Sequence, residues 1–446
     1  MMTTSSESLL AVEDLTGFTH EYVTKRNKVV RRVNVGGDSS EAAYATRAKL
    51  KSSCVNQFET FWRHYLRVGR PEVVQEPDRQ PVTKTVADLF CGVGGLTQGF
   101  AEAMRGLGYQ PSVQLGVDVD AVALEVYKAN HNAKRVLTKS VGEFIDFRTT
   151  GEGETAKFAY QPELTNDKEF PQGLDFLLGG PPCQGHSTLN NYTRSDDPKN
   201  RLYLAMAALA VASGARNVVM ENVPNVVNDK SGVVQSAIQL LRSSGYAIET
   251  GVLAADALGW PQTRKRFFLV ASKEVKPLPL SLVAENLACE PTSLEWCIED
   301  LVDALRPGFV MDDVPEMSEA NRKRVDWLFD HDAFDLPNHQ RPDCHKDGHT
   351  YPSVYGRMHW KQPASTITGG FLTPGRGRYV HPKRRRVLTP HEAARIQGFP
   401  DWFSFRPTDR DPTRAELTKW IGDAVPPILG YAVALSLLVP LKRATS

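Results

Sequence analysis

From residue 85 onward, short apolar runs alternate with longer stretches whose apolar residues recur at helical spacing. Runs such as Thr85–Phe90 and Ser112–Val117 have the length of buried strands, and an amphipathic segment follows each of them. This alternation predicts an α/β fold with a doubly wound, mainly parallel sheet. The other strands predicted are Leu174–Leu178, Asn217–Met220, Ala247–Leu253 and Arg266–Ala271, and the helices are Leu96–Leu107, Ala121–Ala129, Leu202–Ala212 and Val233–Ser243.

The first 80 residues lack this alternation and are interpreted as an N-terminal extension with a mobile, Ser/Thr-rich beginning. Within them, Glu41–Leu66 is predicted as a helix with an apolar face that includes Phe58 and Trp62. The basic stretch Lys25–Arg32 is consistent with a solvated strand or arm, and also with a contact to phosphates. Pro71–Pro81 is predicted as a linker to the region that follows.

The longest uncharged run, Ala424–Leu441, is long enough to raise the question of a membrane span. Prolines and a glycine interrupt it, among them Pro427 and Pro440, so that only about three helical turns remain. A helix of that length is too short to cross a bilayer. We therefore expect a buried helix and no contact with a membrane.

Charge is distributed unevenly, although the whole chain has a net charge of only +1. Residues 1–340 contain 36 basic and 44 acidic side chains, whereas residues 341–446 contain 17 basic and 8 acidic ones. This asymmetry predicts a surface that faces a polyanion in the C-terminal part. Residues 295–335 are acidic and are expected to face away from the polyanion, whereas the basic, glycine-rich residues 341–386 are expected to contact it.

A stiff turn, Gly179–Ser187, follows one predicted strand and carries Cys183. A cysteine there lies at the open end of the strand, where a substrate can reach it and its thiolate can act as a nucleophile. The alternative is a buried cysteine that serves only as a small apolar residue. The six cysteines show no paired spacing, which indicates free thiols in a reducing cytoplasm.

A second turn, Cys91–Gly95, follows the first strand of the α/β region, and Asp118 ends the second strand. The glycines of this turn let a ligand approach the backbone, and the Asp118 side chain can bind ribose hydroxyls. NAD enzymes and S-adenosylmethionine enzymes share this pattern, so it does not distinguish between them.

Six motifs in order along the chain together resemble those of the C5-cytosine DNA methyltransferases, over residues 85–271 and 350–440. The resemblance implies a doubly wound, Rossmann-like S-adenosylmethionine-dependent methyltransferase domain with a small target-recognition domain. A nicotinamide dehydrogenase is excluded because it has no use for the Pro-Pro-Cys turn. The motifs are Asp88–Gly95, Gly179–Ser187, Glu221–Val223, Gln262–Arg266, Arg386–Arg395 and Gly422–Pro427.

The resemblance also implies roles for the residues that match the catalytic motifs. Cys183 would add to carbon 6 of cytosine, and Glu221 would hold and protonate N3, which requires a pKa raised by burial. Arg264 would bind the cytosine O2, with Arg266 supporting the loop. Residues Asn190–Asn200 would close over an extruded base, and a plain surface loop is the alternative.

The cofactor implied is S-adenosylmethionine, with Phe90 and Val119 beside its adenine ring and Asp118 on its ribose. Two positions depart from the family pattern: Ser140 stands where an acidic residue is usual, and Asp423 where an asparagine is usual. The residues expected to bind the cofactor are Phe90, Cys91, Gly92, Gly94, Gly95, Asp118, Val119, Ser140, Leu202, Asp423 and Ala424.

Four regions are predicted: an N-terminal extension (1–80), a catalytic and cofactor-binding domain (81–271), a target-recognition region (272–385) and a return to the catalytic domain (386–446). We expect a monomeric, cytoplasmic, nucleoid-associated enzyme that modifies double-stranded DNA alongside a cognate restriction endonuclease. A tRNA cytosine methyltransferase of the same fold and a catalytically silent DNA-binding protein are the alternatives. No metal is expected, because the spacing of His339, Cys344, His345 and His349 matches no common zinc site.

Overall fold

The computed structural model describes residues 18–45, 56–74, 81–166, 168–182, 200–229, 231–346 and 353–445. Its centre is a seven-stranded sheet in the order β14-β15-β13-β12-β5-β6-β7. The strands are parallel except β15, which runs antiparallel to both of its neighbours. The doubly wound α/β prediction is therefore confirmed. The strands are β5 (Val82–Leu89), β6 (Tyr109–Asp118), β7 (Arg135–Thr138), β12 (Phe176–Gly179), β13 (Asn217–Asn222), β14 (Ala247–Ala254) and β15 (Lys265–Ser272).

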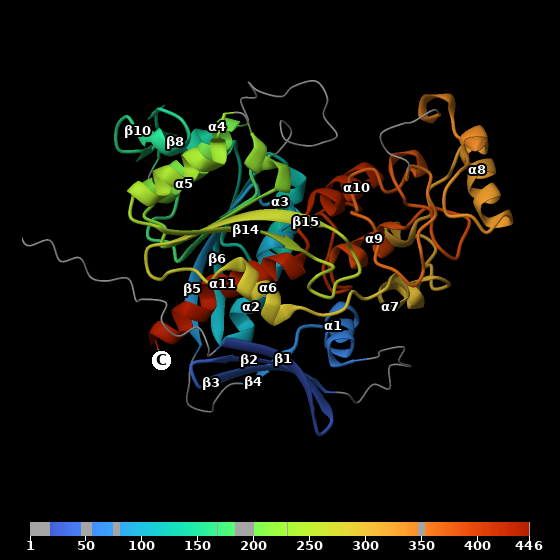
Figure 1. Cartoon of the computed structure of the whole chain (residues 1–446), viewed down its shortest axis with the longest axis horizontal. Helices are drawn as coiled ribbons and strands as arrows, with labels where there is room; N and C mark the ends of the chain where they lie inside the picture. The colour runs from blue at the N-terminus through green and yellow to red at the C-terminus, as the bar shows by residue number, and fades with distance from the viewer. Residues whose placement is uncertain are drawn as a thin grey trace, which may run out of the picture.

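Helices cover both faces of this sheet (Figure 1). Helices α4 and α5 share one hydrophobic core with one face, and α2, α3, α6 and α11 share another core with the opposite face. Four short strands form two small hairpin-like pairs near α4 and α5: β8 (Ile145–Asp146), β9 (Thr149–Thr150), β10 (Lys157–Phe158) and β11 (Glu163–Leu164). The helices are α2 (Gly95–Gly106), α3 (Ala121–His131), α4 (Asn200–Ala212), α5 (Val233–Ser243) and α6 (Leu280–Leu287).

The apolar C-terminal run forms α11 (Pro427–Thr445), which is longer than predicted because Pro440 lies inside the helix instead of ending it. The helical stretch Arg414–Ala444 is long and apolar enough to cross a membrane, but 83% of its most apolar window is buried within the fold. Helix α11 packs directly on α2, where Gly99 leaves room for it: a Cβ on Gly99 would lie 1.8 Å from the Pro427 carbonyl oxygen. The apolar run is thus a core helix, as expected.

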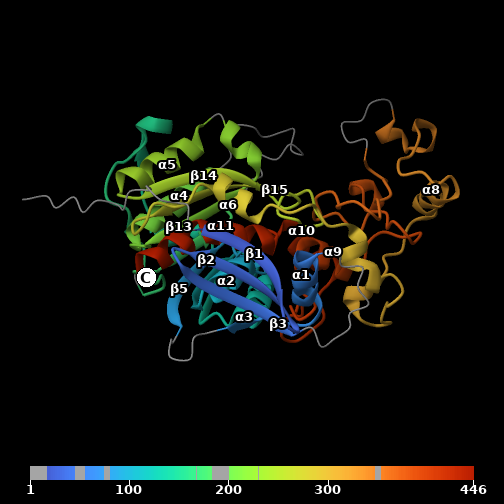
Figure 2. The same ribbon diagram turned by 60° about the horizontal axis from the view of Figure 1, so that its bottom comes forward.

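The N-terminal unit, residues 18–74, is an antiparallel sheet in the order β1-β2-β3-β4 together with α1 (Figure 2). The predicted helix Glu41–Leu66 is wrong in its first part, which forms β3, and among the described residues of this stretch the helix is α1 (Gln57–Arg67). The signal missed was Gly36-Gly37, whose φ angles of 58° and 99° make a tight hairpin turn. The strands are β1 (Phe18–Lys25), β2 (Lys28–Val35), β3 (Asp38–Ala45) and β4 (Glu72–Val74).

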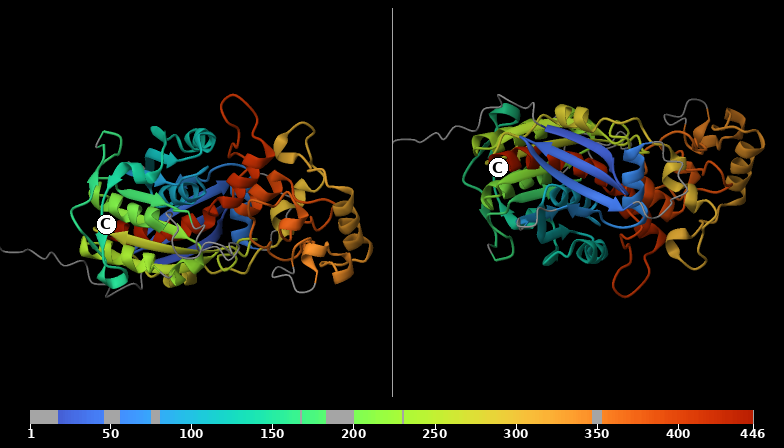
Figure 3. Two further views of the ribbon diagram at one scale, coloured as in Figure 1. Left: turned by 90° about the horizontal axis from the view of Figure 1, so that it is seen from above. Right: turned by 90° about the horizontal axis from the view of Figure 1, so that it is seen from below.

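A smaller, loop-rich module lies at one end of the molecule (Figure 3). We call residues 302–385 the distal module. Part of it has a core of its own around Leu328 and Tyr355, whereas Ile367 and Phe371 join the main core. The preceding residues 272–301 also pack into the main core, so the predicted recognition region is only partly separate. The remaining helices are α7 (Leu294–Ile298), α8 (Glu319–Asp330), α9 (Pro390–Gln397) and α10 (Arg414–Asp423).

The acidic and basic halves that the sequence separates come together in the distal module. Arg357 pairs with Asp332 at 3.1 Å and Arg378 with Asp335 at 2.6 Å. The acidic residues are therefore ion-pair partners of the basic ones, and the expectation that they face away from the polyanion stays a prediction. The other such pairs are Arg384 with Asp303, and Arg385 with Asp326 and Asp330.

Candidate active site

Four neighbouring strands end at the residues singled out from the sequence. Strand β13 ends in Glu221 and Asn222, β12 in Gly179, β5 in Leu89, directly before Phe90, and β6 in Asp118. Because β13, β12, β5 and β6 are adjacent and parallel, their ends meet at one edge of the sheet. The chain order reverses between β12 and β5, and open α/β sheets bind ligands at such a point.

The glycine-rich turn after β5 is held in an unusual conformation at this edge. Phe90 has a φ of 57° and Gly94 one of 95°. A left-handed conformation is costly for a phenylalanine, and such outliers cluster at ligand sites. The Cys91 amide donates to the Val117 carbonyl at 3.1 Å, and the Cys91 side chain is buried. Cys91 can therefore face a ligand only through its backbone.

Asp118 shapes this turn, and an apolar side chain is exposed beside it. The Asp118 carboxylate accepts hydrogen bonds from the Gly92 amide at 2.8 Å and from the Asp120 amide at 2.9 Å. Val119 is 73% exposed, so it offers an apolar surface at the strand end. Trp420 of α10 donates to Asp120 at 3.1 Å, which joins α10 to the same edge.

Ser140 and Leu202 lie close together on the other side of this edge. A Cβ placed on Gly142 would lie 3.7 Å from the Leu202 side chain and 3.9 Å from the Ser140 hydroxyl. The Ser140 amide donates to the Glu143 carboxylate at 2.8 Å, in a capping box. Glu143 thus brings a carboxylate to the position where Ser140 departs from the family pattern. The Ser-x-x-Glu spacing was the signal that sequence reasoning missed.

The first turn of α2 meets the segment before α11. A Cβ on Gly95 would lie 2.3 Å from the Val425 carbonyl oxygen and 3.2 Å from the Ala424 side chain, so only glycine fits there. Burial raises the pKa of the neighbouring Asp423, against the charges of Lys419 and Arg264.

Glu221 and Arg266 form the charged pair at the catalytic end of the edge. The Arg266 Nε lies 2.6 Å from the Glu221 carboxylate, and both side chains are largely buried. Burial raises the pKa of Glu221, and the charges of Arg266 and Arg264 oppose this shift only in part. The carboxyl can therefore keep a proton at a higher pH than a solvated glutamate does.

The two arginines of the Gln262–Arg266 motif lie in different surroundings. Arg264 is buried and donates to backbone carbonyls, at 2.7 Å to Ile367 and at 3.0 Å to Gly422. Its guanidinium therefore ties the distal module to the segment before α11. Arg266, not Arg264, is the arginine that lies beside Glu221, because the antiparallel pairing of β15 with β13 carries it there.

The predicted nucleophile Cys183 lies outside the described residues, as do 184–199, which include the predicted closing loop. The start of the turn that carries Cys183 is described, and it lies against Glu221 of the Glu221–Arg266 pair. A Cβ on Gly180 would lie 3.0 Å from the Glu221 carboxylate, and Asn222 donates to the Pro181 carbonyl at 3.3 Å. The turn that leads to Cys183 is thus braced by the end of β13.

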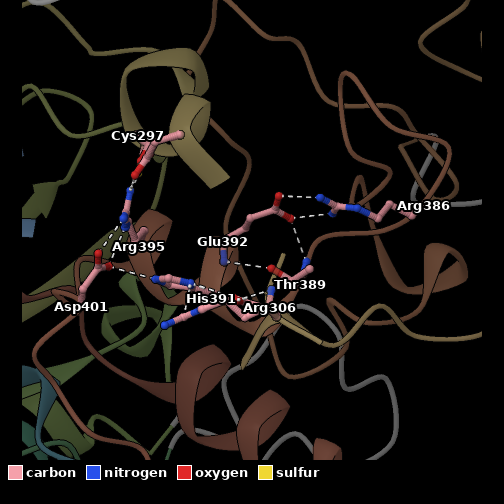
Figure 4. A network of polar contacts seen from close by, with 10 residues as sticks. Cys297, Arg306, Arg386, Thr389, His391, Glu392, Arg395 and Asp401 are labelled. Carbon is pink, nitrogen blue, oxygen red and sulfur yellow. Dashed lines mark hydrogen bonds and ion pairs between the residues drawn. The ribbon is translucent and has the colours of Figure 1, made fainter. Parts of the chain in front are cut away.

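A buried network, which sequence reasoning missed, joins this catalytic body to the distal module (Figure 4). Arg395 of α9 pairs with Asp401 at 2.6 Å and with Asp300 at 2.7 Å. His391 bridges Asp312 at 2.8 Å and Asp401 at 2.9 Å. Burial lowers the pKa of His391, but its bonds to these two carboxylates outweigh burial and raise it above the usual value.

A second part of the network fixes the start of α9. Arg386 makes a two-pronged contact with Glu392, at 2.7 Å for each bond, and the Thr389 amide donates to the same carboxylate. The Thr-x-x-Glu spacing is a capping signal visible in the sequence. Its partner Arg386 lies before the helix, and no local pattern identifies it.

No group of three or more residues suited to holding a metal ion occurs in the part of the chain that the structure describes. His339, Cys344 and His345 are described and form no such group, whereas His349 lies outside the described residues. Cys344 instead contacts the His345 ring at 3.0 Å.

Comparisons with known proteins agree over most of the chain. The family model for C-5 cytosine-specific DNA methylase matches residues 84–438. The type II methyltransferase M1.BsuMI of Bacillus subtilis (strain 168) is 36% identical over 430 residues, which cover 96% of each chain. The type II methylase M.HgiDII of Herpetosiphon aurantiacus is 31% identical over 358 residues, which cover 79% of this chain and 94% of its own.

Two solved structures show the same fold at low sequence identity. A DNA modification methyltransferase encoded within a prophage (E. coli) has a TM-score of 0.53 at 23% identity, covering 80% of this chain and 99% of its own. The Dnmt2 methyltransferase of S. pombe has a TM-score of 0.54 at 16% identity, covering 80% of this chain and 99% of its own.

Proposed function

The chain belongs to the C-5 cytosine-specific DNA methylase family, and on that premise we propose that it transfers a methyl group from S-adenosylmethionine to carbon 5 of cytosine within a specific duplex DNA sequence. It is a DNA (cytosine-5)-methyltransferase, and its type II relatives support a place in restriction-modification. The observation that carries the proposed mechanism is the buried Glu221–Arg266 pair against the turn that leads to Cys183.

The described residues fit S-adenosylmethionine at the edge between β12 and β6. Phe90 and the exposed Val119 offer apolar surface for an adenine ring, and the glycine turn opens the backbone to a ligand. Asp118 and Glu143 place two carboxylates where hydroxyl and amine groups can be bound. When bound, the cofactor supplies an electrophilic methyl group.

Replacing Asp118 by alanine is expected to weaken cofactor binding at least about tenfold, since each hydrogen bond to a charged acceptor is worth about 1.5–3 kcal/mol. Isothermal titration with S-adenosylmethionine measures the change. Asp118→Asn keeps one acceptor oxygen and should lose less. Cofactor affinity unchanged in Asp118→Ala would show that another residue binds the ribose.

The chain's own groups then account for the activation of cytosine. The Cys183 thiolate forms a bond to carbon 6, while Glu221 gives a proton to N3 and Arg266 stabilises the charge that develops at O2. Carbon 5 becomes nucleophilic and takes the methyl group. Loss of the carbon 5 proton to a base then breaks the bond to sulfur and restores the thiolate, and N3 returns its proton to Glu221. A base inside a duplex is out of reach of these groups, so the cytosine must be flipped out.

We assign the reading of the DNA sequence to the distal module, and within it to Arg376. Arg357 and Arg378 also belong to the basic residues 341–386, but both bind carbonyls and carboxylates of their own module. Arg376 is exposed beside Gly370 and has no ion-pair partner among the described residues. Its guanidinium is therefore available to a guanine edge.

Arg376→Ala is expected to relax the methylation site at one base pair, at a cost of about 1–3 kcal/mol in discrimination. Bisulfite sequencing of a plasmid library methylated by each variant reads this out. Arg378→Ala is the matched control, and it should lower thermal stability and leave the site unchanged. A site unaltered in Arg376→Ala would move the reading residues elsewhere in the chain.

Bisulfite sequencing of DNA from cells that express the protein tests the function as a whole, and methylated cytosines in one sequence context are the expected result. Methylation found only in tRNA would favour the tRNA methyltransferase instead, and no methylation at all would favour a silent DNA-binding protein. Action as a monomer in the cytoplasm, beside a partner endonuclease, belongs to the same proposal.

A further inference from the structure

We propose that the N-terminal unit is a two-sided brace, in which Arg31 of β2 positions the helices of the cofactor site and Arg67 of α1 positions the base of the distal module. The unit precedes residues 84–438, the part that the family model matches. The inference rests on the proposed function, because it assigns cofactor binding to one side of the brace and DNA binding to the other.

Arg31 is a buried cation that contacts both α2 and α11, the two helices beside the proposed cofactor site. It is 1% exposed, and its guanidinium lies 2.9 Å from the Glu102 carboxylate of α2. On another side the guanidinium lies 4.6 Å from the centre of the Tyr431 ring of α11. Phe61 of α1 also contacts it, at 4.9 Å. A buried charge held by one carboxylate and by aromatic faces depends on all of them.

These helices carry the cofactor turn directly. Helix α2 starts at Gly95, which touches the Val425 carbonyl, and a Cβ on Gly430 of α11 would lie 2.7 Å from the Leu96 carbonyl. With contacts this close, a shift of α2 against α11 must move the glycine turn. Two further bonds from the N-terminal unit hold the same helices, from Gln98 to the Tyr65 hydroxyl at 2.8 Å and between His20 and the Tyr431 hydroxyl at 2.9 Å.

The other side of the brace is the last turn of α1. Arg67 lies 2.8 Å from Asp300, the residue that Arg395 of α9 also binds. The Asp401 amide donates to the Leu66 carbonyl at 2.7 Å. Asp300 and Asp401 are the two carboxylates that hold Arg395 in the network joining the catalytic body to the distal module (Figure 4). Helix α1 is therefore placed to set the position of that module.

The test uses the full-length protein and two variants, each of which should weaken the binding of a different ligand. Arg31→Met should raise the dissociation constant and KM for S-adenosylmethionine about 2- to 30-fold, the range of changes made within a coupling network, and leave kcat and duplex affinity nearly unchanged. Arg67→Met should raise the dissociation constant for a duplex carrying the mapped site and leave the cofactor constant unchanged. Arg31→Lys keeps the charge and should recover part of the cofactor affinity.

Arg32→Met is the matched control, because Arg32 pairs with Glu21 and Glu41 away from both sites and should change neither constant. If Arg31→Met and Arg67→Met weaken both ligands equally, or neither, the brace is only a scaffold and the inference is overturned. Failure of the wild type to bind S-adenosylmethionine would instead overturn the proposed function itself.

Hydrogen exchange on the wild type tests the cofactor side even where Arg31→Met does not fold. Adding S-adenosylmethionine should slow amide exchange in β2. This strand contacts α2 and α11 through Arg31 and does not reach the glycine turn, so the cofactor can affect it only through these helices. Exchange in β2 that does not respond to the cofactor would contradict the coupling.

Discussion

Replacing Cys183 by alanine is expected to abolish methyl transfer and leave DNA binding intact. In the proposed mechanism the thiolate bond to carbon 6 is what makes carbon 5 a nucleophile, so no other group of the chain can replace it. A duplex carrying 5-fluorocytosine at the target provides the direct measurement. Fluorine replaces the carbon 5 proton whose loss frees the enzyme, so wild-type protein should remain covalently attached to the duplex and Cys183→Ala should not.

Cys344→Ala is the matched control for this experiment, because Cys344 is an exposed thiol of the distal module. It should be trapped as fully as the wild type. Covalent trapping that persists in Cys183→Ala would assign the nucleophile to another cysteine and would sink the proposed mechanism.

Glu221→Gln should lower kcat by about 10²- to 10⁴-fold, the usual contribution of a positioned proton donor. The glutamine has nearly the same size and can still contact Arg266, so the fold should survive. Burial raises the pKa of the Glu221 carboxyl above its value in the unfolded chain. The contribution of this group to stability is therefore full at low pH and is lost as the pH rises through the raised pKa. Activity should fall over the same interval, as the proton donor is lost.

The pH profile of kcat separates this role from a merely structural one. The wild type should show a decline on the alkaline side of the Glu221 pKa, and Glu221→Gln should not. Glu249 on β14 is the matched control, since burial also raises its pKa but it lies on the outermost strand of the sheet. Glu249→Gln should keep both the rate and the profile. A Glu221→Gln enzyme with the wild-type rate would rule out proton donation by this residue.

The catalytic sheet could be predicted because each of its elements carries a local signal. Apolar runs marked β5, β6 and β12–β15, and α5 has the bounds that its amphipathic spacing predicts. The motif order then placed Glu221, Asp118 and the glycine turn on one edge, and the structure brings them there. Strand β7 and the short strands β8 to β11 were missed because they are brief and carry little apolar periodicity.

The features that the sequence did not predict depend on contacts between distant parts of the chain. Whether Arg264 or Arg266 faces Glu221 is decided by the register of β15 against β13, which the motif itself does not contain. The charge split gave no sign of the ion pairs for a similar reason, since Arg378 and Asp335 are far apart in sequence but pair in space. Arg31 looked like part of a solvated arm, and only the docking of β2 on α2 shows it buried.

The contact between α2 and α11 also has a consequence for how this protein folds during synthesis. Helix α2 follows the first strand of the central sheet, and its partner α11 is synthesised only after the rest of that sheet. Until then the face of α2 that receives α11, which includes Leu96 and Gly99, is not covered by that helix. Contacts between such distant segments form late, because a long loop must close first. Nascent chains should therefore depend on chaperones until α11 has been synthesised, and acquire cofactor affinity only once it packs on α2.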